Sequence, residues 1–507
     1  MSASDDKPVS PAPEAAAAAT SADKKPEDPS DLLKDLSIAS DANAAKPSDE
    51  KTADKPADDK VDAAKSDSTE TKEDAKPKAT EDSSLIRSEY EVKVKLADLQ
   101  ADPNSPLYSV KSFEELGLSD ELLKGLYAMK FSKPSKIQEK ALPLLIRDPP
   151  QNMIGQSQSG TGKTAAFSLT MLTRVDPSKN YPQAICLSPS RELARQTYDV
   201  VTTMGKYTDT KVQLVVPQSV PRGENVRSQI VVGTPGLVAD LIQRRYLDTK
   251  HVKVFVLDEA DNMLEGQGGL GDQSIKIKRK MPKDCQIVLF SATFPDKVRK
   301  FASAQAPNAN ELTLQQNELN VKEIKQLWMK CEKNVKGKTK YDVLVELYGL
   351  LTIGSSIVFV EMKETADLVF AKLRNDGHAC SILHSNLEHS ERDRLIDEFR
   401  DGKTKVLITT NVLARGIDIP TVTMVVNYDM PTVRGDGRTA DTSTYLHRVG
   451  RTGRFGRLGV SISLVDNANS ENALHQIEKD LDITMTQLPN DDWDEIETIC
   501  KAAIKGK

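Results

Sequence analysis

Glycines and hydroxyl residues surround a single lysine in the run Ser157-Gln158-Ser159-Gly160-Thr161-Gly162-Lys163-Thr164. Such a loop lets backbone N–H groups converge on phosphate oxygens, and the start of a following helix adds a favourable dipole. Lys163 could then reach the β- and γ-phosphates of a nucleotide, and the Thr164 hydroxyl could bind Mg²⁺. Ser157 departs from the usual pattern, which has a glycine at that position. We therefore expect a nucleotide site formed by Ser159, Gly160, Thr161, Gly162, Lys163 and Thr164.

A second reactive cluster, Asp258-Glu259-Ala260-Asp261, directly follows the apolar run Val254–Leu257. A carboxylate at the end of a buried strand can hold the Mg²⁺ of a nucleotide, so we predict that Asp258 does so through water. Glu259 is then the candidate base that orients and deprotonates the attacking water. The alternative is an acidic helix N-terminus that only complements the helix dipole. The phosphate-binding run upstream favours the catalytic interpretation, because nucleotide hydrolysis needs both features.

The elements that must position these clusters are short apolar runs, each followed at once by a polar or glycine-containing turn. Strands of a parallel sheet give this pattern, and ligands bind beyond the carboxyl ends of such strands. The turns that follow the first four runs are therefore expected to meet at one crevice. These runs are Ala184–Leu187, Gln229–Val232, Val254–Leu257 and Gln286–Phe290.

The same pattern repeats and predicts a second parallel sheet, formed by Ser356–Val360, Cys380–Leu383, Lys405–Ile408, Met424–Asn427 and Ser461–Val465. The fold class is thus α/β, with two domains in tandem and a cleft between them. Residues rich in Asn and Gln suit the linker that joins the domains. The predicted division is 113–306 for the first domain, 307–322 for the linker, 323–488 for the second domain and 489–507 for a C-terminal helix.

Composition separates the N-terminal part of the chain from these domains. Residues 1–82 contain no Phe, Tyr, Trp or Cys, and they hold 21 acidic and 12 basic residues, a net charge of -9. They cannot bury enough apolar surface to offset the entropy of ordering, so we predict a disordered tail. Within it, Leu32–Ile38 is apolar at helical spacing and is either a docking or export-type peptide or a chance cluster. The whole chain carries -6, so residues 83–507 carry +3, a balance compatible with nucleic-acid binding.

The five cysteines are well separated in the sequence, which predicts neither a zinc site nor a disulfide framework and favours a reducing compartment. No stretch is apolar enough to span a membrane, and the N-terminus lacks the apolar segment of a signal peptide. We therefore expect a soluble intracellular protein without membrane insertion. Residues 83–112 carry apolar positions that the tail lacks, so they are expected to dock on the core as a regulatory segment.

Together these motifs resemble those of the DEAD-box ATP-dependent RNA helicases, from about residue 113 to 488. Asp258–Asp261 spell the family name in one-letter code, and Phe131–Gln138 resembles the adenine-reading Q motif. The resemblance implies two RecA-like domains, RNA-dependent ATP hydrolysis, and ATP with Mg²⁺ as cofactors. It assigns Lys136 and Gln138 to the nucleotide and Phe113 to stacking on the base. A Gln amide can both donate to and accept from adenine and so reject guanine.

In the second half of the chain, Tyr445–Arg454 resembles motif VI of the family. The resemblance implies that Arg451 and Arg454 act as arginine fingers on the γ-phosphate and that His447 couples the nucleotide and RNA sites. A basic surface turn is the alternative, which the two glycines of the run disfavour. Base and fingers on different domains would make hydrolysis depend on cleft closure. The remaining matches are Gly416 and Asp418 in motif V and Ser291 and Thr293 in motif III.

RNA is expected to bind through its sugar–phosphate backbone, single-stranded or as a short duplex, with little sequence specificity. Taken singly, each matching position could also be an ordinary turn or helix cap. The chain departs from the family at three elements: Val216–Ser219 replaces a Gly-Gly, Leu237 an Arg, and His389 a Gln. The matching positions are Pro189, Arg191, Thr234, Pro235 and Gly236 in the first domain and Arg392 and Thr410 in the second.

A closer resemblance is to the DEAD-box ATPases of mRNA export at the cytoplasmic face of the nuclear pore. It rests on Asp102–Tyr108, Gln156–Gln158, Arg434–Ser443 and Asn490–Glu495. It implies remodelling of RNA–protein complexes, and a location in cytoplasm and nucleus, concentrated at the pore. It also implies two partners: a nucleoporin on the first domain, and an export activator bound to both domains with inositol hexakisphosphate as a bridge. Lys501 and Lys505 are candidate contacts for that polyphosphate, and a solvated basic helix end is the alternative.

Other functions fit parts of the sequence. An ATP-gated RNA clamp in another step of RNA metabolism, such as translation, would carry the same motifs but hydrolyse ATP rarely. A DNA helicase fits the Q motif and the short core less well, and dependence of ATPase stimulation on the RNA 2′-hydroxyl would separate it from an RNA helicase. A P-loop kinase would not need Arg451 and Arg454 on a second sheet.

Overall fold

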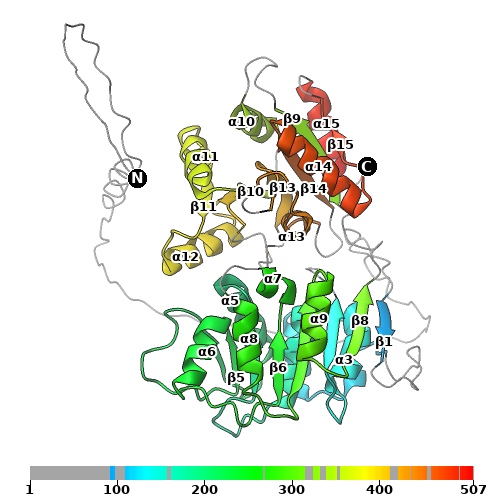
Figure 1. Ribbon diagram of the computed structural model, residues 1–507, viewed down its shortest axis with the longest axis vertical. Coiled ribbons are helices and arrows are strands. Elements are labelled where there is room, and N and C mark those ends of the chain that lie inside the picture. Colours follow the sequence, from blue (N-terminus) through cyan, green and yellow to red (C-terminus); the bar gives the residue numbers. More distant parts are fainter. Residues whose placement is uncertain are drawn as a thin grey trace, which may run out of the picture. The chain divides into compact units, whose positions relative to one another are not determined.

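The computed structural model describes residues 92–96, 109–156, 161–265, 269–314, 324–331, 339–350, 354–411, 419, 421–433, 436–453, 458–489 and 492–505. The predicted tail, with Leu32–Ile38, and most of residues 83–112 lie outside these ranges. Within them, the helices are too short or too polar to cross a membrane. The described residues form two sheets with flanking helices (Figure 1).

The first sheet has eight strands in the order β1-β8-β2-β7-β6-β3-β5-β4, and only β1 runs antiparallel to its neighbour. Its strands are β1 (Val92–Lys95), β2 (Met153–Gln156), β3 (Ala184–Leu187), β4 (Val212–Val215), β5 (Ile230–Gly233), β6 (Val254–Leu257), β7 (Gln286–Ser291) and β8 (Asn310–Leu314). The helices of this part are η2 (Glu114–Leu116), α2 (Asp120–Ala128), α3 (Lys136–Ile146), α4 (Lys163–Arg174), α5 (Arg191–Met204), α6 (Pro235–Gln243), α7 (Ala260–Glu265), α8 (Leu270–Lys278) and α9 (Asp296–Gln305).

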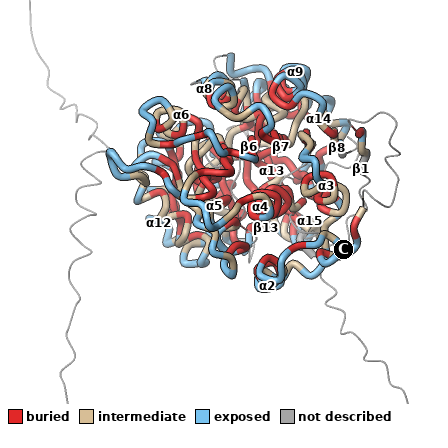
Figure 2. The backbone as a smooth tube through the Cα atoms, turned by 90° about the horizontal axis from the view of Figure 1, so that it is seen from below, coloured by how far each residue is buried: buried red, intermediate tan, exposed pale blue. Residues whose placement is uncertain are grey.

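Alternate residues of the central strands of this sheet enter two different cores. In β3, Ala184 and Cys186 pack with apolar residues of α2 to α5, whereas Ile185 and Leu187 pack with those of α6 to α9. A strand that is buried on both faces reads as a continuous apolar run, which is why these strands were predictable. Figure 2 shows buried residues in the interior and exposed residues on the outer helix faces.

The second sheet has seven strands in the order β11-β12-β10-β13-β14-β9-β15, and all of its neighbouring pairs are parallel. Its strands are β9 (Ile324–Lys330), β10 (Ser355–Phe359), β11 (Cys380–Leu383), β12 (Val406–Thr409), β13 (Val422–Asn427), β14 (Gly459–Val465) and β15 (Thr486–Gln487). Its helices are α10 (Lys340–Leu350), α11 (Lys363–Asn375), α12 (His389–Arg400), α13 (Thr442–Val449), α14 (Ala468–Leu481) and α15 (Trp493–Lys505).

Part of the predicted linker, 307–322, belongs to the first sheet, because Asn310–Leu314 form β8 beside β2. Leu312 enters the first core, and the buried Asn310 amide donates to Gln151 Oε1 at 3.1 Å. An asparagine that suggested a linker is thus a buried amide at the start of a strand. The N-terminal segment extends the same edge, since β1 pairs with β8 and Leu96 packs into the first core.

Buried amide side chains tie loops to the strands of the first sheet. The Gln229 amide donates to the backbone carbonyls of Pro177 and Lys179 at 3.1 and 2.6 Å, and its oxygen accepts from Lys211 N at 2.8 Å. Gln183 makes the matching pair of bonds with the backbone of Asp176. An amide suits this role because it can donate and accept at once, and buried backbone groups need such partners.

Replacing Gln229 with Leu should therefore destabilise the fold although the volume is nearly kept. The change leaves two carbonyls and one N–H without their protein partner. Because these groups belong to exposed loop residues that water can reach, the expected loss is about 1–3 kcal/mol in total. Urea titration of the full chain should record the loss as a lower unfolding midpoint. Gln243→Leu is the matched control, because Gln243 is exposed and its change should stay within about 0.5 kcal/mol. Equal midpoints for the two variants would contradict the role of Gln229.

Candidate nucleotide and RNA site

The phosphate-binding run leads directly into α4. Gly162 is the N-cap of this 12-residue helix and has φ 98°, a conformation that suits glycine. A Cβ on Gly162 would lie 2.5 Å from Gln138 Nε2, so this position has no room for a side chain. Lys163 follows and is buried at 6% exposure. Thr161 to Thr164 thus present a helix N-terminus suited to phosphate, whereas Ser159 and Gly160 lie outside the described residues.

Side chains of the predicted Q motif donate hydrogen bonds to the backbone of this loop. Gln138 Nε2 donates to Gly162 O at 3.0 Å, and Ser135 Oγ donates to Thr161 O at 2.8 Å. Gln138 Oε1 also accepts from Ser135 N at 2.9 Å, which completes a capping box at the start of α3. Gln138 therefore supports the predicted phosphate-binding loop, besides its predicted role at adenine.

The other two residues predicted to bind the nucleotide lie in different environments. Phe113 is 1% exposed and packs in the first core, so base stacking by this ring stays a prediction. Lys136 is exposed and pairs with Glu139 at 3.6 Å in the first turn of α3.

Three buried carboxylates follow β6 within four residues. Asp258, Glu259 and Asp261 are 2%, 4% and 0% exposed. Burial, together with the charges of Glu259 and Asp261, raises the pKa of Asp258 to about 7, while Lys163 opposes the shift. A buried carboxylate in this state favours a cation as its partner. Asp258 and the Thr164 hydroxyl are oxygen donors of the kind Mg²⁺ prefers, and water and phosphate oxygens would complete its shell.

Glu259 has an unusual backbone for a residue other than glycine, with φ 51°. Its N–H donates to Asp258 Oδ1 at 3.0 Å. Its Oε2 is buried and has no hydrogen-bond partner among the described residues. Strained backbone and an unsatisfied acceptor both cost stability, and such features concentrate at functional sites. This arrangement fits a base that is held ready for a water molecule.

Asp261 links the acidic cluster to motif III and to the second sheet. It accepts from Thr293 N and Thr293 Oγ1 at 3.0 and 2.7 Å, and its own N–H donates to Ser291 Oγ at 3.1 Å. His447 Nε2 of α13 lies 3.6 Å from Asp261 Oδ2. His447 and the hydrogen bonds from Thr293 favour the charged form of Asp261, so its pKa lies below the usual value despite burial. The predicted coupling residues Ser291, Thr293 and His447 therefore meet at one carboxylate.

The arginines of motif VI lie at the end of α13. Arg448 is fully buried, donates to Asn411 Oδ1 at 2.9 and 2.7 Å, and lies over the Phe359 ring. Burial lowers its pKa to about 10. Arg451 is 3% exposed, and its Nε donates to His447 O at 3.0 Å. The other predicted finger, Arg454, and the motif V residues Gly416 and Asp418 lie outside the described residues.

The predicted RNA contacts lie at helix starts next to strand ends. Pro189 and Arg191 precede and open α5, and Thr234, Pro235 and Gly236 open α6. In the second sheet, Thr410 follows β12 and Arg392 lies in the first turn of α12. Arg191 Nη2 contacts Asp393 at 2.7 Å, and Arg392 pairs with the buried Glu192. The tertiary structure thus places the predicted RNA contact Arg191 of the first sheet's domain close to Arg392 of the second.

Several residues in these networks were not predicted as site residues. Asp261, Glu192 and Arg448 all stand inside motifs that the sequence reveals, so proximity to a motif was a usable signal. Asn411 and Asp393 directly follow the predicted RNA contacts Thr410 and Arg392, but their own partners, Arg448 and Arg191, are distant in the sequence.

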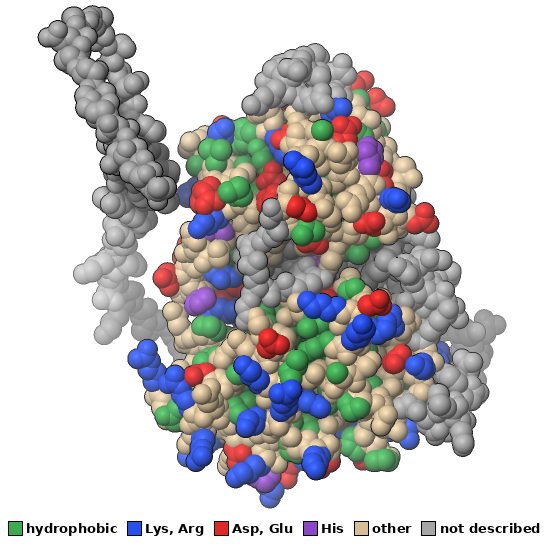
Figure 3. Space-filling model, in the orientation of Figure 1, with side chains coloured by type: hydrophobic (Ala, Val, Ile, Leu, Met, Phe, Trp, Pro, Cys, Tyr) green, Lys and Arg blue, Asp and Glu red, His purple; other side chains and the backbone are tan. Residues whose placement is uncertain are grey.

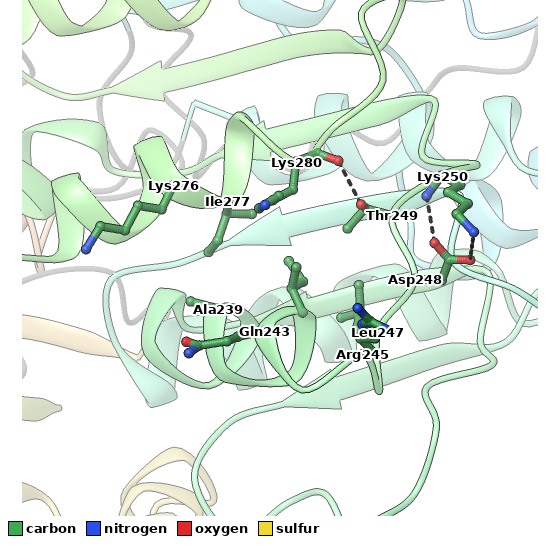
Figure 4. A pocket seen from close by; sticks show the side chains of 11 residues that line it. Ala239, Gln243, Arg245, Leu247, Asp248, Thr249, Lys250, Lys276, Ile277 and Lys280 are labelled. Atoms are coloured by element: carbon green, nitrogen blue, oxygen red, sulfur yellow. Dashed lines mark hydrogen bonds and ion pairs between the residues drawn. The ribbon is translucent and has the colours of Figure 1, made fainter.

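A cavity of about 840 Å³ lies between α6 and α8, and none of its lining residues is a predicted site residue (Figure 4). Ile242, Leu247 and Ile277 are among its apolar lining. Four basic side chains, Arg245, Lys250, Lys276 and Lys280, and one acidic side chain, Asp248, also line it. Figure 3 shows further Lys and Arg side chains spread over the surface of the domain that holds the first sheet. An anionic partner fits this cavity better than a cationic one.

Comparison with known proteins follows the same division of the chain. Residues 135–301 match the DEAD/DEAH box helicase family and residues 339–456 match the helicase conserved C-terminal domain. The ATP-dependent RNA helicase DBP5 of Scheffersomyces stipitis is 66% identical over 423 residues, which is 83% of this chain and 83% of that protein.

Solved structures give a similar result. Saccharomyces cerevisiae Dbp5 bound to RNA and ADP BeF3 matches with a TM-score of 0.74 at 62% identity, over 78% of this chain and 100% of that chain. A variant of the same protein bound to Nup159, a Gle1 variant, IP6 and ADP matches over 77% and 100% of the two chains at 60% identity, with a TM-score of 0.57.

Proposed function

Because this chain belongs to the DEAD-box family of ATP-dependent RNA helicases, we propose that it binds Mg²⁺–ATP and RNA across its two sheets and remodels RNA–protein complexes in mRNA export. The catalytic part of this proposal rests on one observation: residues from the domains of both sheets lie next to Asp261. His447 of α13 lies 3.6 Å from a carboxylate that also orders Ser291 and Thr293. Both parts of the machinery must therefore be in place for hydrolysis.

Each residue has a separate task in this mechanism. Lys163 and the N-terminus of α4 bind the phosphates, and Asp258 with Thr164 would hold Mg²⁺. A Mg²⁺ ion held by these residues would supply positive charge against the negative charge that develops on the phosphates. Glu259 orients the attacking water and takes its proton at a carboxylate oxygen. Arg451 and Arg454 stabilise charge on the transferred phosphoryl group, which makes turnover depend on the second sheet.

The test is ATP hydrolysis by the full chain with and without RNA. We expect stimulation by single-stranded RNA that requires Mg²⁺, falls with salt and is weaker with DNA of the same sequence. Lys163→Ala should abolish hydrolysis in either condition, because the phosphates lose their main charged partner. Hydrolysis that RNA does not stimulate would contradict the proposal. Equal stimulation by DNA would favour a DNA helicase, and a single turnover followed by long RNA residence would favour the RNA clamp.

The export role is supported by the relatives. A Dbp5 structure with Nup159, Gle1 and IP6 is one of the matches, so we propose a nucleoporin and an export activator as partners. Such partners would place the protein in cytoplasm and nucleus, with its highest concentration at the cytoplasmic face of the pore. Inositol hexakisphosphate would bridge the activator to α15.

The polyphosphate prediction concerns the end of α15. Lys501 pairs with Glu497 one turn earlier, so this lysine would have to exchange that carboxylate for phosphate. The side chain of Lys505 lies outside the described residues. Replacing both lysines with Glu should leave RNA-stimulated ATPase unchanged but remove further stimulation by activator plus inositol hexakisphosphate. Lys479→Glu on α14 is the control, because it reverses one positive charge at an exposed site outside α15. A normal response of the double variant would reject the contact.

A further inference from the structure

A group of charged side chains joins α5 of the first sheet to α12 of the second. Arg195 Nη2 lies 2.7 Å from Asp397 Oδ2, and Arg195 Nη1 lies 3.5 Å from Asp393 Oδ1. The side chains of Arg195, Asp393 and Asp397 are 30%, 21% and 40% exposed. One guanidinium thus spans two carboxylates in a partly buried place, where ion pairs are less screened than on an open surface.

Arg195 differs from its neighbours in this group. Arg191 and Arg392 match positions that contact RNA phosphates, whereas Arg195 matches no predicted nucleotide or RNA position. It lies four residues after Arg191, so the two share one face of α5. The Asp393 carboxylate contacts both arginines, and Arg191 Nη2 lies 2.7 Å from Asp393 Oδ2. Arg195 is therefore placed to hold α12 beside the arginines that would bind RNA.

Arg195 is one of three arginines that balance the carboxylates of this contact, together with Arg191 at Asp393 and Arg400 at Asp397. Asp199 on α5 is an exposed residue whose carboxyl is partly desolvated, and this desolvation is the first cause of its raised pKa. The charges of Asp393 and Asp397 raise the pKa further, while Arg195 and Arg400 oppose the shift. Loss of Arg195 would leave Asp199, Asp393 and Asp397 with only Arg191 and Arg400 to balance their charge, so repulsion between the two helices would increase. Such like-charge crowding pushes the helices apart, so the effect extends beyond one lost ion pair.

We propose that Arg195, Asp393 and Asp397 form a latch that holds the two sheets in the RNA-binding arrangement, with Arg195 as its positioning residue. This inference rests on the proposed function. None of its three residues is a predicted contact of ATP or RNA, so the latch would act by assembling the surfaces that bind them. Its loss should therefore raise the RNA concentration needed for half-maximal ATPase and leave the rate at saturating RNA nearly unchanged.

The experiment compares Arg195→Gln, Asp397→Asn and the double variant in the full chain. Binding of a fluorescent single-stranded RNA in the presence of ADP and beryllium fluoride gives the affinity, and ATPase titrated with RNA gives KM and kcat. We expect each single variant to bind RNA about 5- to 30-fold more weakly, with kcat within about twofold. The double variant should bind RNA no more weakly than Arg195→Gln, because each of the two changes removes the same ion pair.

The sign of the Asp397→Asn effect separates the latch from simple electrostatics. Removing a negative charge near RNA would strengthen binding if charge alone mattered, whereas the latch requires weaker binding. Arg394→Gln is the control for helix α12, because Arg394 pairs with Glu391 and Glu398 of its own helix. This control should bind RNA as the parent does.

A direct readout of closure keeps the latch testable apart from hydrolysis. Dyes on Gln243→Cys and Lys479→Cys, both exposed, would report the distance between the two sheets by energy transfer. Arg195→Gln should reduce the closed fraction at a given RNA concentration. Stronger or unchanged RNA binding by Asp397→Asn, or additive effects in the double variant, would overturn the latch. A parent protein that RNA does not stimulate would instead overturn the proposed function.

Discussion

Replacing Glu259 with Gln should abolish ATP turnover while Mg²⁺–ATP and RNA still bind. The amide cannot take a proton from water, and loss of a general base costs about 10²–10⁴-fold in rate. The proposed contacts of Lys163, Thr164 and Asp258 to phosphate and metal are not altered by this change. The measurement is kcat in RNA-stimulated hydrolysis, together with the affinity of the full chain for labelled ATP.

The same change should raise the melting temperature of the nucleotide-free protein. Glu259 buries an oxygen without a partner, and its charge is one cause of the raised pKa of Asp258. Removing that charge relieves repulsion in the cluster, as expected where activity and stability are in conflict. Glu224→Gln, at an exposed loop position, is the control and should change neither quantity. Hydrolysis near the parent rate in Glu259→Gln would assign the base to another group.

Replacing Arg454 with Ala should lower kcat by about 10³–10⁵-fold, the range known for arginine fingers supplied in trans. Arg451 lies three residues earlier, is 3% exposed and is held by His447 O. His447 in turn approaches Asp261, which places motif VI beside the acidic cluster. A finger acts mainly on charge that develops in the transition state, so the affinity for ATP should fall much less than the rate.

Two variants sharpen this prediction. Arg454→Lys keeps the charge but loses the planar fork, so it should restore only part of the rate. Arg438→Ala removes a charge from an exposed loop before α13 and should leave kcat unchanged. A collapse of ATP affinity with normal turnover per bound ATP would identify Arg454 as a ground-state ligand instead.

Much of the fold was predictable because parallel strands buried on both faces are continuous apolar runs. The runs at Ala184–Leu187, Val254–Leu257 and Cys380–Leu383 coincide with β3, β6 and β11. Strands at the edges or ends of the sheets were harder, since they are short or polar. Asn310–Leu314 begins with a polar residue whose burial depends on Gln151, far away in the sequence.

The sequence by itself determined the chemistry of the site and the family, because phosphate, Mg²⁺ and water require particular residue types at short, fixed spacings. Asp258 and Glu259, or Gly162 and Lys163, are neighbours in the chain whatever the fold. Only the tertiary structure decided which of these groups support one another. The pairs Gln138 with Gly162 O, Asp261 with His447, and Arg195 with Asp397 join residues that are 24, 186 and 202 positions apart. Ion pairs and hydrogen bonds act over a few ångströms, so partners this distant in sequence are set by sheet order and helix packing, which local patterns do not encode.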